Sequence, residues 1–543
     1  MASKTIAMEI GALVYRYRYF FLGLIGFVLF SAFSAAFPIY ILDEAKNSEA
    51  AREMLVSQNY FMPTFNGALR TDKPPLHYFL MMLSYSLFGV GPFAARFFSA
   101  VAGALMLVLI TRSTERYLNW FTASITALVL SSSLLFAQEF HLAVPDPFLI
   151  LFVTASLLYF FDHDQQPSKK RLILAYSFMG LGLLSKGPIA LVIVGLTALL
   201  YFGASKKLSW RYLLSFYPFT GLLLSLCIAA PWYIGAHIAT DGAFTEGFFL
   251  DHNLNRFSDQ KEGHGGPFIL TIAWVLVGLL PFGVWLIPAW YSAFKSRWDH
   301  DFLRFCFSVG LVIVVFFSFS DTKLPNYPMP AFAFLGVLIA DYFARLPEQT
   351  SRKTLRWGLI SLIAFGVLAV VGAHIGVKQH PALGELSYLS FALLPISLGA
   401  FALLLRHKGL APLQFVLALA LNWMLTGWLL WGWAFPTMNA HAPTAKAFPF
   451  IAEKEVVVYK RLDPAFLIQT QRTFTQFDSA EALQKWTAER SETLILTNTK
   501  DALDLEFLSA HYELILEAPA LFEDNVTRLW RVIKSDTPGQ LLR

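Results

Sequence analysis

The chain has 543 residues, of which 56% are hydrophobic, 16% aromatic and only 15% charged, and its formal net charge is +5. This composition, with a mean hydropathy of +0.53, predicts a polytopic membrane protein. The positive charge then relates to topology and lipid contact, and nucleic-acid binding is excluded. Cys227 and Cys306 both lie in apolar runs, which excludes a disulfide framework and a zinc-knuckle pattern.

Thirteen apolar segments have lengths close to that of a membrane span, and the first is retained as a span because it shows no convincing cleavage site. They cover about residues 19–37, 93–111, 121–138, 147–162, 172–184, 188–203, 211–230, 268–291, 303–319, 328–345, 357–376, 388–405 and 411–433. A further run, 76–90, is short and contains polar residues. If this run does not cross the membrane, the loops between spans that are rich in Lys and Arg lie on the same side as the N-terminus. The positive-inside rule makes that side cytoplasmic. We therefore predict an interfacial or re-entrant helix at 76–90.

Segment 38–75 follows the first span and is unusually rich in charged residues. Its hydrophobic pattern predicts an amphipathic helix over residues 43–57, lying at the bilayer surface with its charges away from the apolar side. That helix places Asp43 and Glu44 at the mouth of whatever the membrane part encloses. The same topology puts several other segments on the outer side, where loops on a rigid scaffold carry function: 138–147, 185–188, 231–267, 320–327 and the C-terminal part.

The composition changes after Phe435, where charges become frequent and apolar runs shrink to strand length. We expect strands at 456–459, 493–496, 512–516 and 527–532, and helices at 480–490 and 500–509. The predicted fold class is an α-helical polytopic membrane protein with juxtamembrane helices and a small C-terminal α/β domain. We place the transmembrane domain at residues 1–433 and the α/β domain at 434–543.

The acidic candidates have two interpretations each. Asp43 and Glu44 either complement the dipole of a helix in its first turn or form a carboxylate site for a general base or a cation ligand. Asp146, between two prolines ahead of a span, is either a helix cap or a catalytic residue.

Lys73, Lys186 and Lys323 lie in predicted outer segments, although the positive-inside rule places most lysines in cytoplasmic loops. Together they predict binding of an anion, most simply a phosphate. Arginines on the same side either add to this field or form surface ion pairs: Arg52, Arg70, Arg96 and Arg256.

A divalent-metal site formed by Asp72, His252 and His264 is a further hypothesis. No spacing matches a zinc pattern, and hydrogen-bonded loop histidines are the simpler interpretation. No cofactor is therefore required by the sequence, although a divalent metal ion stays open.

The combined motifs resemble those of the polyprenyl-phosphate-dependent glycosyltransferases of the GT-C type. They are the Asp43–Glu44 pair after the first span, the DKPP run 72–75, the FG turn 88–89 with Arg96 beyond it, Asp146, the SKGP run 185–188 and the TKLPNYP run 322–328. Within this class the chain resembles the bacterial lipid A 4-amino-4-deoxy-L-arabinose (aminoarabinose) transferases, with protein O-mannosyltransferases more distant. The resemblance covers most of residues 1–345.

The resemblance implies an enzyme that transfers this aminosugar from undecaprenyl phosphate to lipid A phosphates, giving resistance to polymyxin and cationic peptides. It implies a monomer in the bacterial inner membrane, with the active site and the C-terminal domain in the periplasm. Asp43 and Asp146 would be the catalytic acids. The residues that hold phosphate or the lipid carrier would be Lys46, Lys73, Lys186, Lys323 and Tyr327. The residues that bind the acceptor or have a supporting role would be Glu44, Arg52, Arg70 and Arg256. Lys46 stands where relatives have arginine, and Asp72 where many have glutamate.

Two alternatives stay open. A GT-C enzyme similar to protein O-mannosyltransferases would share the chemistry but use a peptide or glycan acceptor. A transporter of lipid-linked sugars would share the apolar bulk, yet transporters usually place charges near the bilayer midplane. Here the charges gather in outer loops, which favours surface chemistry.

Overall fold

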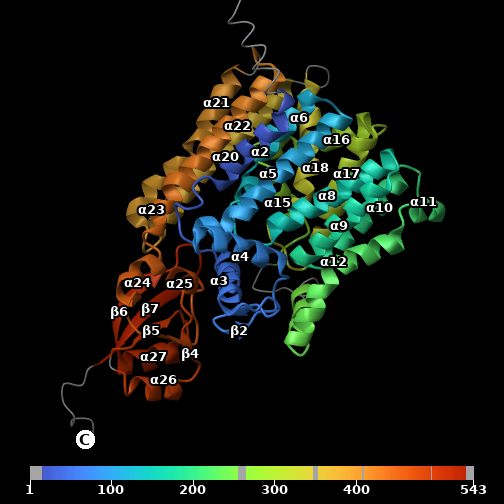
Figure 1. The fold of residues 1–543 in the computed structure, drawn as a ribbon. Coiled ribbons are helices and arrows are strands. Elements are labelled where there is room, and N and C mark those ends of the chain that lie inside the picture. Colours follow the sequence, from blue (N-terminus) through green and yellow to red (C-terminus); the bar gives the residue numbers. More distant parts are fainter. Residues whose placement is uncertain (1–14, 255–264, 347–351, 407–408, 491, 534–543) are drawn as a thin grey trace, which may run out of the picture.

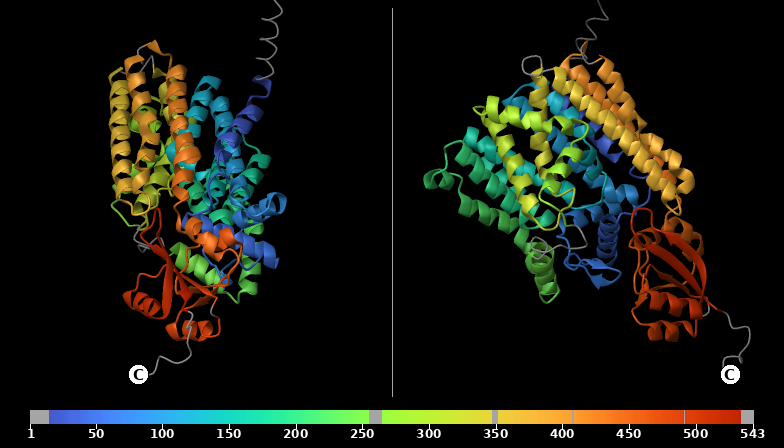
Figure 2. Two further views of the ribbon diagram at one scale, coloured as in Figure 1. Left: turned by 90° about the vertical axis from the view of Figure 1, so that its left-hand side faces the viewer. Right: turned by 180° about the vertical axis from the view of Figure 1, so that it is seen from behind.

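The computed structural model describes residues 15–254, 265–346, 352–406, 409–490 and 492–533. A body of packed helices makes up most of it, and a smaller α/β part lies at one end (Figure 1). The segment of α3 and α4 lies at that same end, between the helical body and the α/β part (Figures 1 and 2).

Helices follow one another through the helical body. The first half contains α2 (Arg18–Ser31), α3 (Leu42–Ser57), the hairpin β1 (Thr64–Phe65) and β2 (Ala68–Leu69), α4 (Leu76–Phe88), α5 (Pro92–Tyr117), α6 (Trp120–Ser132), α7 (Leu134–Glu139), α8 (Asp146–Gln165), α9 (Lys169–Lys186), α10 (Ile189–Ala204), α11 (Trp210–Leu214), α12 (Pro218–Ala239), α13 (Ala243–Glu246) and the π-helix η1 (Gly247–Leu254). The second half contains α15 (Ile269–Gly278), η2 (Phe282–Trp285), α16 (Leu286–Ser296), α17 (Asp301–Phe319), η3 (Met329–Ala331), α18 (Phe332–Ala344), α20 (Arg352–Gln379), η4 (Gly384–Leu393), α21 (Leu394–Arg406), α22 (Pro412–Leu429), η6 (Leu430–Ala434) and α23 (Phe435–Asn439).

Every predicted span coincides with at least one of these helices, and the protein is a multi-pass membrane protein. Within the described ranges, seven helices are long and apolar enough to cross a membrane, and shorter apolar helices take several of the other predicted positions. The predicted fold class is confirmed. The predicted helix at 76–90 is present as α4.

The predicted span at 268–291 is not one continuous helix. There α15 ends at Gly278, and α16 begins only at Leu286. Pro281 cannot donate a backbone hydrogen bond and disfavours a continuous helix. Gly283 then packs so closely that a Cβ atom would lie 1.9 Å from the carbonyl oxygen of Leu276.

The surface position expected for the charges of the 43–57 helix is also wrong. Helix α3 forms over Leu42–Ser57, and Ala45, Ala50 and Met54 lie in a hydrophobic cluster as the pattern indicates. However, four of its charged residues are buried as well: Glu44, Glu49, Arg52 and Glu53. These side chains find partners inside the protein, so the helix is enclosed instead of lying on a lipid surface.

The α/β part begins with α24 (Pro443–Ile451) and contains a mixed five-stranded sheet in the order β4-β3-β5-β7-β6. Its strands are β3 (Val456–Tyr459), β4 (Thr475–Phe477), β5 (Leu494–Thr497), β6 (Tyr512–Pro519) and β7 (Val526–Val532). Strand β3 is parallel to β4 and β5, whereas β7 is antiparallel to β5 and β6. The four predicted strands and two predicted helices are confirmed, but β4 was missed. The domain boundary at 433/434 stays a prediction.

Alternate residues of the sheet face two hydrophobic clusters. Val456 and Val458 pack with α24 and α25 (Ala465–Thr470) on one face. Val457 and Tyr459 pack with α26 (Ala480–Thr487) and α27 (Ala502–His511) on the other. This period of two is that of a strand buried on both faces.

The α/β part docks on the segment between α2 and α5. The Asn66 side chain donates to the carbonyl of Phe474 at 3.0 Å and accepts from its N–H at 2.8 Å. Gln469 donates to the carbonyl of Ile39 at 3.3 Å. Segment 38–75 is therefore held from both sides, which fixes the position of its charged side chains.

Candidate active site

An ion pair joins the ends of two neighbouring helices. Asp146 opens α8 and Lys186 closes α9, and the lysine Nζ lies 2.5 Å from Asp146 Oδ1. Gly187 follows with φ +77°, a backbone conformation that favours glycine and ends the helix at the lysine. The Lys186 ammonium also lies 5.1 Å from the centre of the Tyr327 ring, a cation–π distance.

A second, longer pair comes from the segment that precedes α4. Lys73 Nζ lies 3.9 Å from Asp43 Oδ2 in the first turn of α3. The side chain of Lys73 is 10% exposed and that of Asp43 is 55% exposed. Pro74 and Pro75 follow Lys73 and lead into α4. They therefore set the position of Lys73 relative to α3.

One cavity of about 380 Å³ brings together three of the five predicted phosphate residues, Lys73, Lys186 and Tyr327. Its polar lining is Asp72, Lys73, Asp146, Lys186, His252, Ser320 and Tyr327, and its apolar lining is Pro74, Leu149, Pro188, Ile189, Val192, Phe248, Phe249, Phe316 and Phe317. We call it the lysine cavity. Two ammonium groups beside apolar walls suit an anion that carries a long hydrocarbon chain.

Asp43 faces a second cavity, of about 390 Å³, formed with the α/β part. Its lining includes Tyr40, Leu324, Asp463 and Glu523. Burial and the nearby Glu523 raise the pKa of Asp463 to about 6. We call it the junction cavity. The Asp43–Lys73 pair thus lies between the junction cavity and the lysine cavity, with one member lining each.

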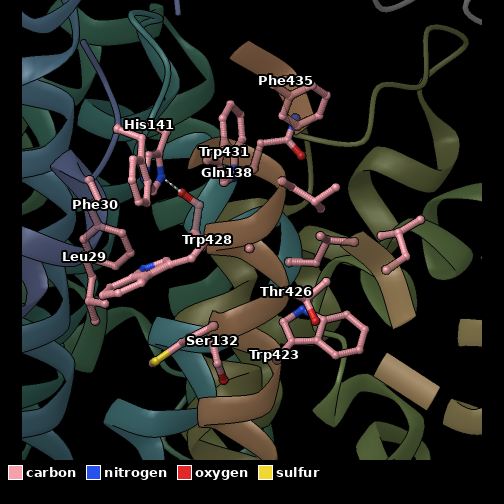
Figure 3. A pocket seen from close by; sticks show the side chains of 18 of the residues that line it. Leu29, Phe30, Ser132, Gln138, His141, Trp423, Thr426, Trp428, Trp431 and Phe435 are labelled. Carbon is pink, nitrogen blue, oxygen red and sulfur yellow. Dashed lines mark hydrogen bonds between the residues drawn. The ribbon is translucent and has the colours of Figure 1, made fainter. Parts of the chain in front are cut away.

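A third cavity, of about 290 Å³, shares Tyr40 and Ile41 with the junction cavity and is mostly apolar. We call it the aromatic cavity. Figure 3 shows its wall of Trp423, Trp428 and Trp431. His141 stacks on Trp431 with the ring planes 5° apart. An apolar space next to the junction cavity suits acyl chains.

The remaining acids and arginines of segment 38–75 have partners within the protein. Glu44 accepts two hydrogen bonds from Arg96, and both side chains are at most 1% exposed. Arg52 pairs with Glu49 at 2.6 Å. Arg70 donates to Tyr78 and Asn47, and it pairs with Asp72. The structure thus gives Glu44, Arg52 and Arg70 partners other than the predicted acceptor; their supporting role stays a prediction.

The other predicted phosphate residues lie apart from the lysine cavity. Lys46 is half-buried on α3 and lines none of the three cavities. Lys323 is buried and donates to the carbonyl of Ser320 at 2.6 Å. Their roles in phosphate binding stay predictions, which this geometry does not favour.

The hypothesis of a metal site stays a prediction. His252 Nε2 lies 3.2 Å from Asp72 Oδ1 in the lysine cavity. His264 and Arg256 lie outside the described residues. Among the described residues no group of three or more His, Cys, Asp or Glu side chains is arranged to hold a metal ion.

Glu139 is a site neighbour that sequence reasoning missed. It closes α7, is 6% exposed and interacts electrostatically with Asp146 and Lys186. Its position in the predicted outer segment 138–147, seven residues before Asp146, was the available signal.

The protein combines a helical membrane body, an apolar-walled cavity that contains Lys73 and Lys186, and an adjoining α/β part. This is the architecture that the motifs predicted, that of a GT-C-type glycosyltransferase. Residues 72–234 match the family described as "Dolichyl-phosphate-mannose-protein mannosyltransferase". The fold is similar to the crystal structure of ArnT from Cupriavidus metallidurans bound to undecaprenyl phosphate, with a TM-score of 0.76, 18% identity, and 96% of this chain and 99% of that chain covered.

Two curated relatives carry the name undecaprenyl phosphate-alpha-4-amino-4-deoxy-L-arabinose arabinosyl transferase. The protein from Edwardsiella ictaluri is 29% identical over 66% of this chain and 66% of its own length. Transferase 2 from Proteus mirabilis is 31% identical over 65% of each chain. The chain therefore aligns with just under two thirds of the length of these relatives. The resemblance to the GT-C type, and within it to the aminoarabinose transferases, is confirmed.

Proposed function

We propose that this protein is an integral membrane glycosyltransferase that moves 4-amino-4-deoxy-L-arabinose from undecaprenyl phosphate to phosphate groups of lipid A. The reaction takes place at the periplasmic face of the inner membrane, and the enzyme acts as a monomer. The observation that carries the proposal is the lysine cavity, where Lys73 and Lys186 meet beside apolar walls, with Asp43 at its edge. The names of the relatives agree with this donor.

The lysine cavity suits the donor. In the transfer, the bond between the sugar anomeric carbon and the carrier phosphate oxygen breaks, and undecaprenyl phosphate leaves with the electron pair. The growing negative charge lies between Lys73 and Lys186, where exclusion of water strengthens its stabilisation. The apolar walls accept the first part of the polyprenyl chain. Tyr327 packs against Lys186 and keeps the ammonium directed at the phosphate.

The junction cavity and the aromatic cavity suit the acceptor. A phosphate monoester has a second pKa of about 6, so it is ionised near neutral pH and needs little help from a base. An oxygen of this phosphate forms the new bond to the anomeric carbon. Asp43, half exposed at the boundary of the two sites, orients the acceptor or holds the ammonium of the sugar. The aromatic cavity then takes acyl chains. A single displacement inverts the anomeric centre.

The test is transfer by the purified protein in liposomes, with the undecaprenyl-phosphate aminosugar as donor and lipid A as acceptor. We expect added mass on lipid A with the wild type, and loss of it in Asp43→Asn and Lys73→Ala. The matched control is Lys485→Ala on the exposed side of α26, which removes a lysine far from the cavities. Transfer to a peptide or glycan, but not to lipid A, would move the enzyme to the mannosyltransferase-like alternative. A donor that is never consumed would favour the transporter.

A further inference from the structure

Glu139 brings a second carboxylate to a site that has one nearby lysine. It closes α7, and its side chain lies near Asp146 from α8, Lys186 from α9 and Asn326 from the loop before Tyr327. The Asn326 side chain hydrogen-bonds to it, whereas Oε1 is buried and accepts no hydrogen bond from any described residue. A buried carboxylate oxygen without a donor is costly when charged, and protonation removes that cost.

The charges around Glu139 act in the same direction. Lys186 is held by Asp146 at 2.5 Å, and Asp43 adds a more distant negative charge. Two carboxylates that compete for one ammonium do not both ionise readily in a buried site. Burial, followed by the repulsion from Asp146, raises the pKa of Glu139 to about 8. Although burial alone lowers the pKa of Lys186, Asp146 and Tyr327 raise it above the usual value, so the lysine stays charged.

We propose that Glu139 is a positioning residue of the phosphate site, which in its protonated form leaves Lys186 available to the carrier phosphate and in its ionised form competes for that lysine. The identity of the anion rests on the proposed function. With Glu139 neutral, Asp146 and Lys186 cancel, and an arriving phosphate meets no net negative charge from this triplet. With Glu139 ionised the triplet carries a net charge of −1, which repels the phosphate.

The sign of the pH effect follows. As the pH rises through the pKa of Glu139, the proton is lost and the fraction of binding-competent protein falls. If only the protonated form binds, the apparent Kd is the intrinsic Kd divided by that fraction, so binding at pH 9 is weaker by about tenfold than below pH 7. Undecaprenyl phosphate has its own second ionisation near pH 6, outside this window.

The experiment measures the Kd of undecaprenyl phosphate between pH 7 and pH 9.5 for the full-length protein in detergent. We expect weakening with pH in the wild type and a flat, tight curve in Glu139→Gln, which keeps the shape and stays neutral. The matched control Asp321→Asn changes an exposed carboxylate in the neighbouring loop and should follow the wild type. Parallel curves for the wild type and Glu139→Gln would overturn the inference, as would a flat wild-type curve.

An infrared titration of the protonated carboxyl band gives a readout that does not depend on the ligand. The wild type should show a band that disappears near pH 8 and that Glu139→Gln lacks. Disappearance of the band below pH 6 would overturn the inference even if Glu139→Gln failed to fold. If the wild type bound no undecaprenyl phosphate at any pH, the proposed function would fail, while this titration would still decide the protonation of Glu139.

Discussion

Asp43 and Glu44 are neighbours in sequence, yet the structure places them in opposite environments, and two isosteric variants separate the roles that we propose for them. Glu44 accepts from Arg96 Nε at 2.7 Å and from its terminal nitrogen at 2.8 Å, and Glu44 Oε1 also accepts from the backbone N–H of Ala143 at 3.0 Å. Arg96 further donates to the carbonyl of Ser34 at 2.7 Å. One buried pair therefore ties α3 to α5, to the end of α2 and to the loop before α8. Asp43, by contrast, is half exposed beside Lys73.

The expected costs differ by several kcal/mol. Removing one partner of a buried, hydrogen-bonded ion pair leaves a buried charge uncompensated and costs about 3–5 kcal/mol. That is a large share of a typical unfolding free energy of about 5–15 kcal/mol. A partly exposed pair with its atoms 3.9 Å apart contributes about 0–1 kcal/mol. Glu44→Gln should therefore destabilise the protein strongly, whereas Asp43→Asn should leave its stability almost unchanged.

The assay combines a melting curve in detergent with the rate of sugar transfer per folded molecule. Glu44→Gln should melt well below the wild type and retain its turnover where folded, and Asp43→Asn should melt normally and lose turnover. Replacing both Glu44 and Arg96 by methionine should recover part of the stability, because no buried charge is then left alone. Wild-type melting of Glu44→Gln, or normal turnover of Asp43→Asn, would refute this division of roles.

Other variants test other parts of the site. Lys186→Ala should lower the transfer rate by about 10²–10³-fold, the usual effect of losing one group that stabilises a developing anion, and initial rates at saturating donor check this. Asn66→Ala removes both hydrogen bonds to Phe474 and should weaken the docking of the α/β part by about 1–3 kcal/mol. The weaker docking should appear as faster proteolysis between the helical body and the α/β part, and unchanged proteolysis would contradict it. The pKa of Asp463 in the folded protein is raised to about 6, so its contribution to the free energy of unfolding is present at low pH and is lost as the pH rises through 6. Asp463→Asn should therefore raise the melting temperature more at pH 7 than at pH 4. Trp428→Ala should raise the KM for the lipid acceptor several-fold without changing donor affinity, and an equal change in both would argue against an acceptor role for the aromatic cavity.

Much of the fold could be predicted because its signals are local. Apolar runs long enough to span a bilayer located the helices, and the burial of β3 on both faces is visible in its short valine-rich run. Strand β4, three residues long and mostly exposed, carries no such signal, and its place in the sheet depends on pairing with β3. Lys73 and Lys186 were found because topology makes outer lysines unusual.

The burial of Glu44 on α3 could not be predicted because its partners are distant in sequence. Glu44 is matched by Arg96 and by the backbone of Ala143, which lie 52 and 99 residues further on. A charged helix that faces water and one that is enclosed by such partners have the same local pattern. Glu139 was missed for the same reason, since only the folded structure brings it near Asp146 and Lys186.

The two pairs at the start of α3 explain how one short segment combines rigidity with exchange. The Glu44–Arg96 pair is short, bidentate and buried, so it fixes where α3 begins relative to the helical body. The Asp43–Lys73 pair, one residue away, is long and partly exposed, so an arriving phosphate can displace the carboxylate from Lys73 at little cost. Because Lys73 lines the lysine cavity and Asp43 lines the junction cavity, that exchange would release Asp43 toward the acceptor side when the donor binds. In the proposed reaction, donor binding and acceptor orientation would then be coupled through a pair that a rigid neighbour holds in place.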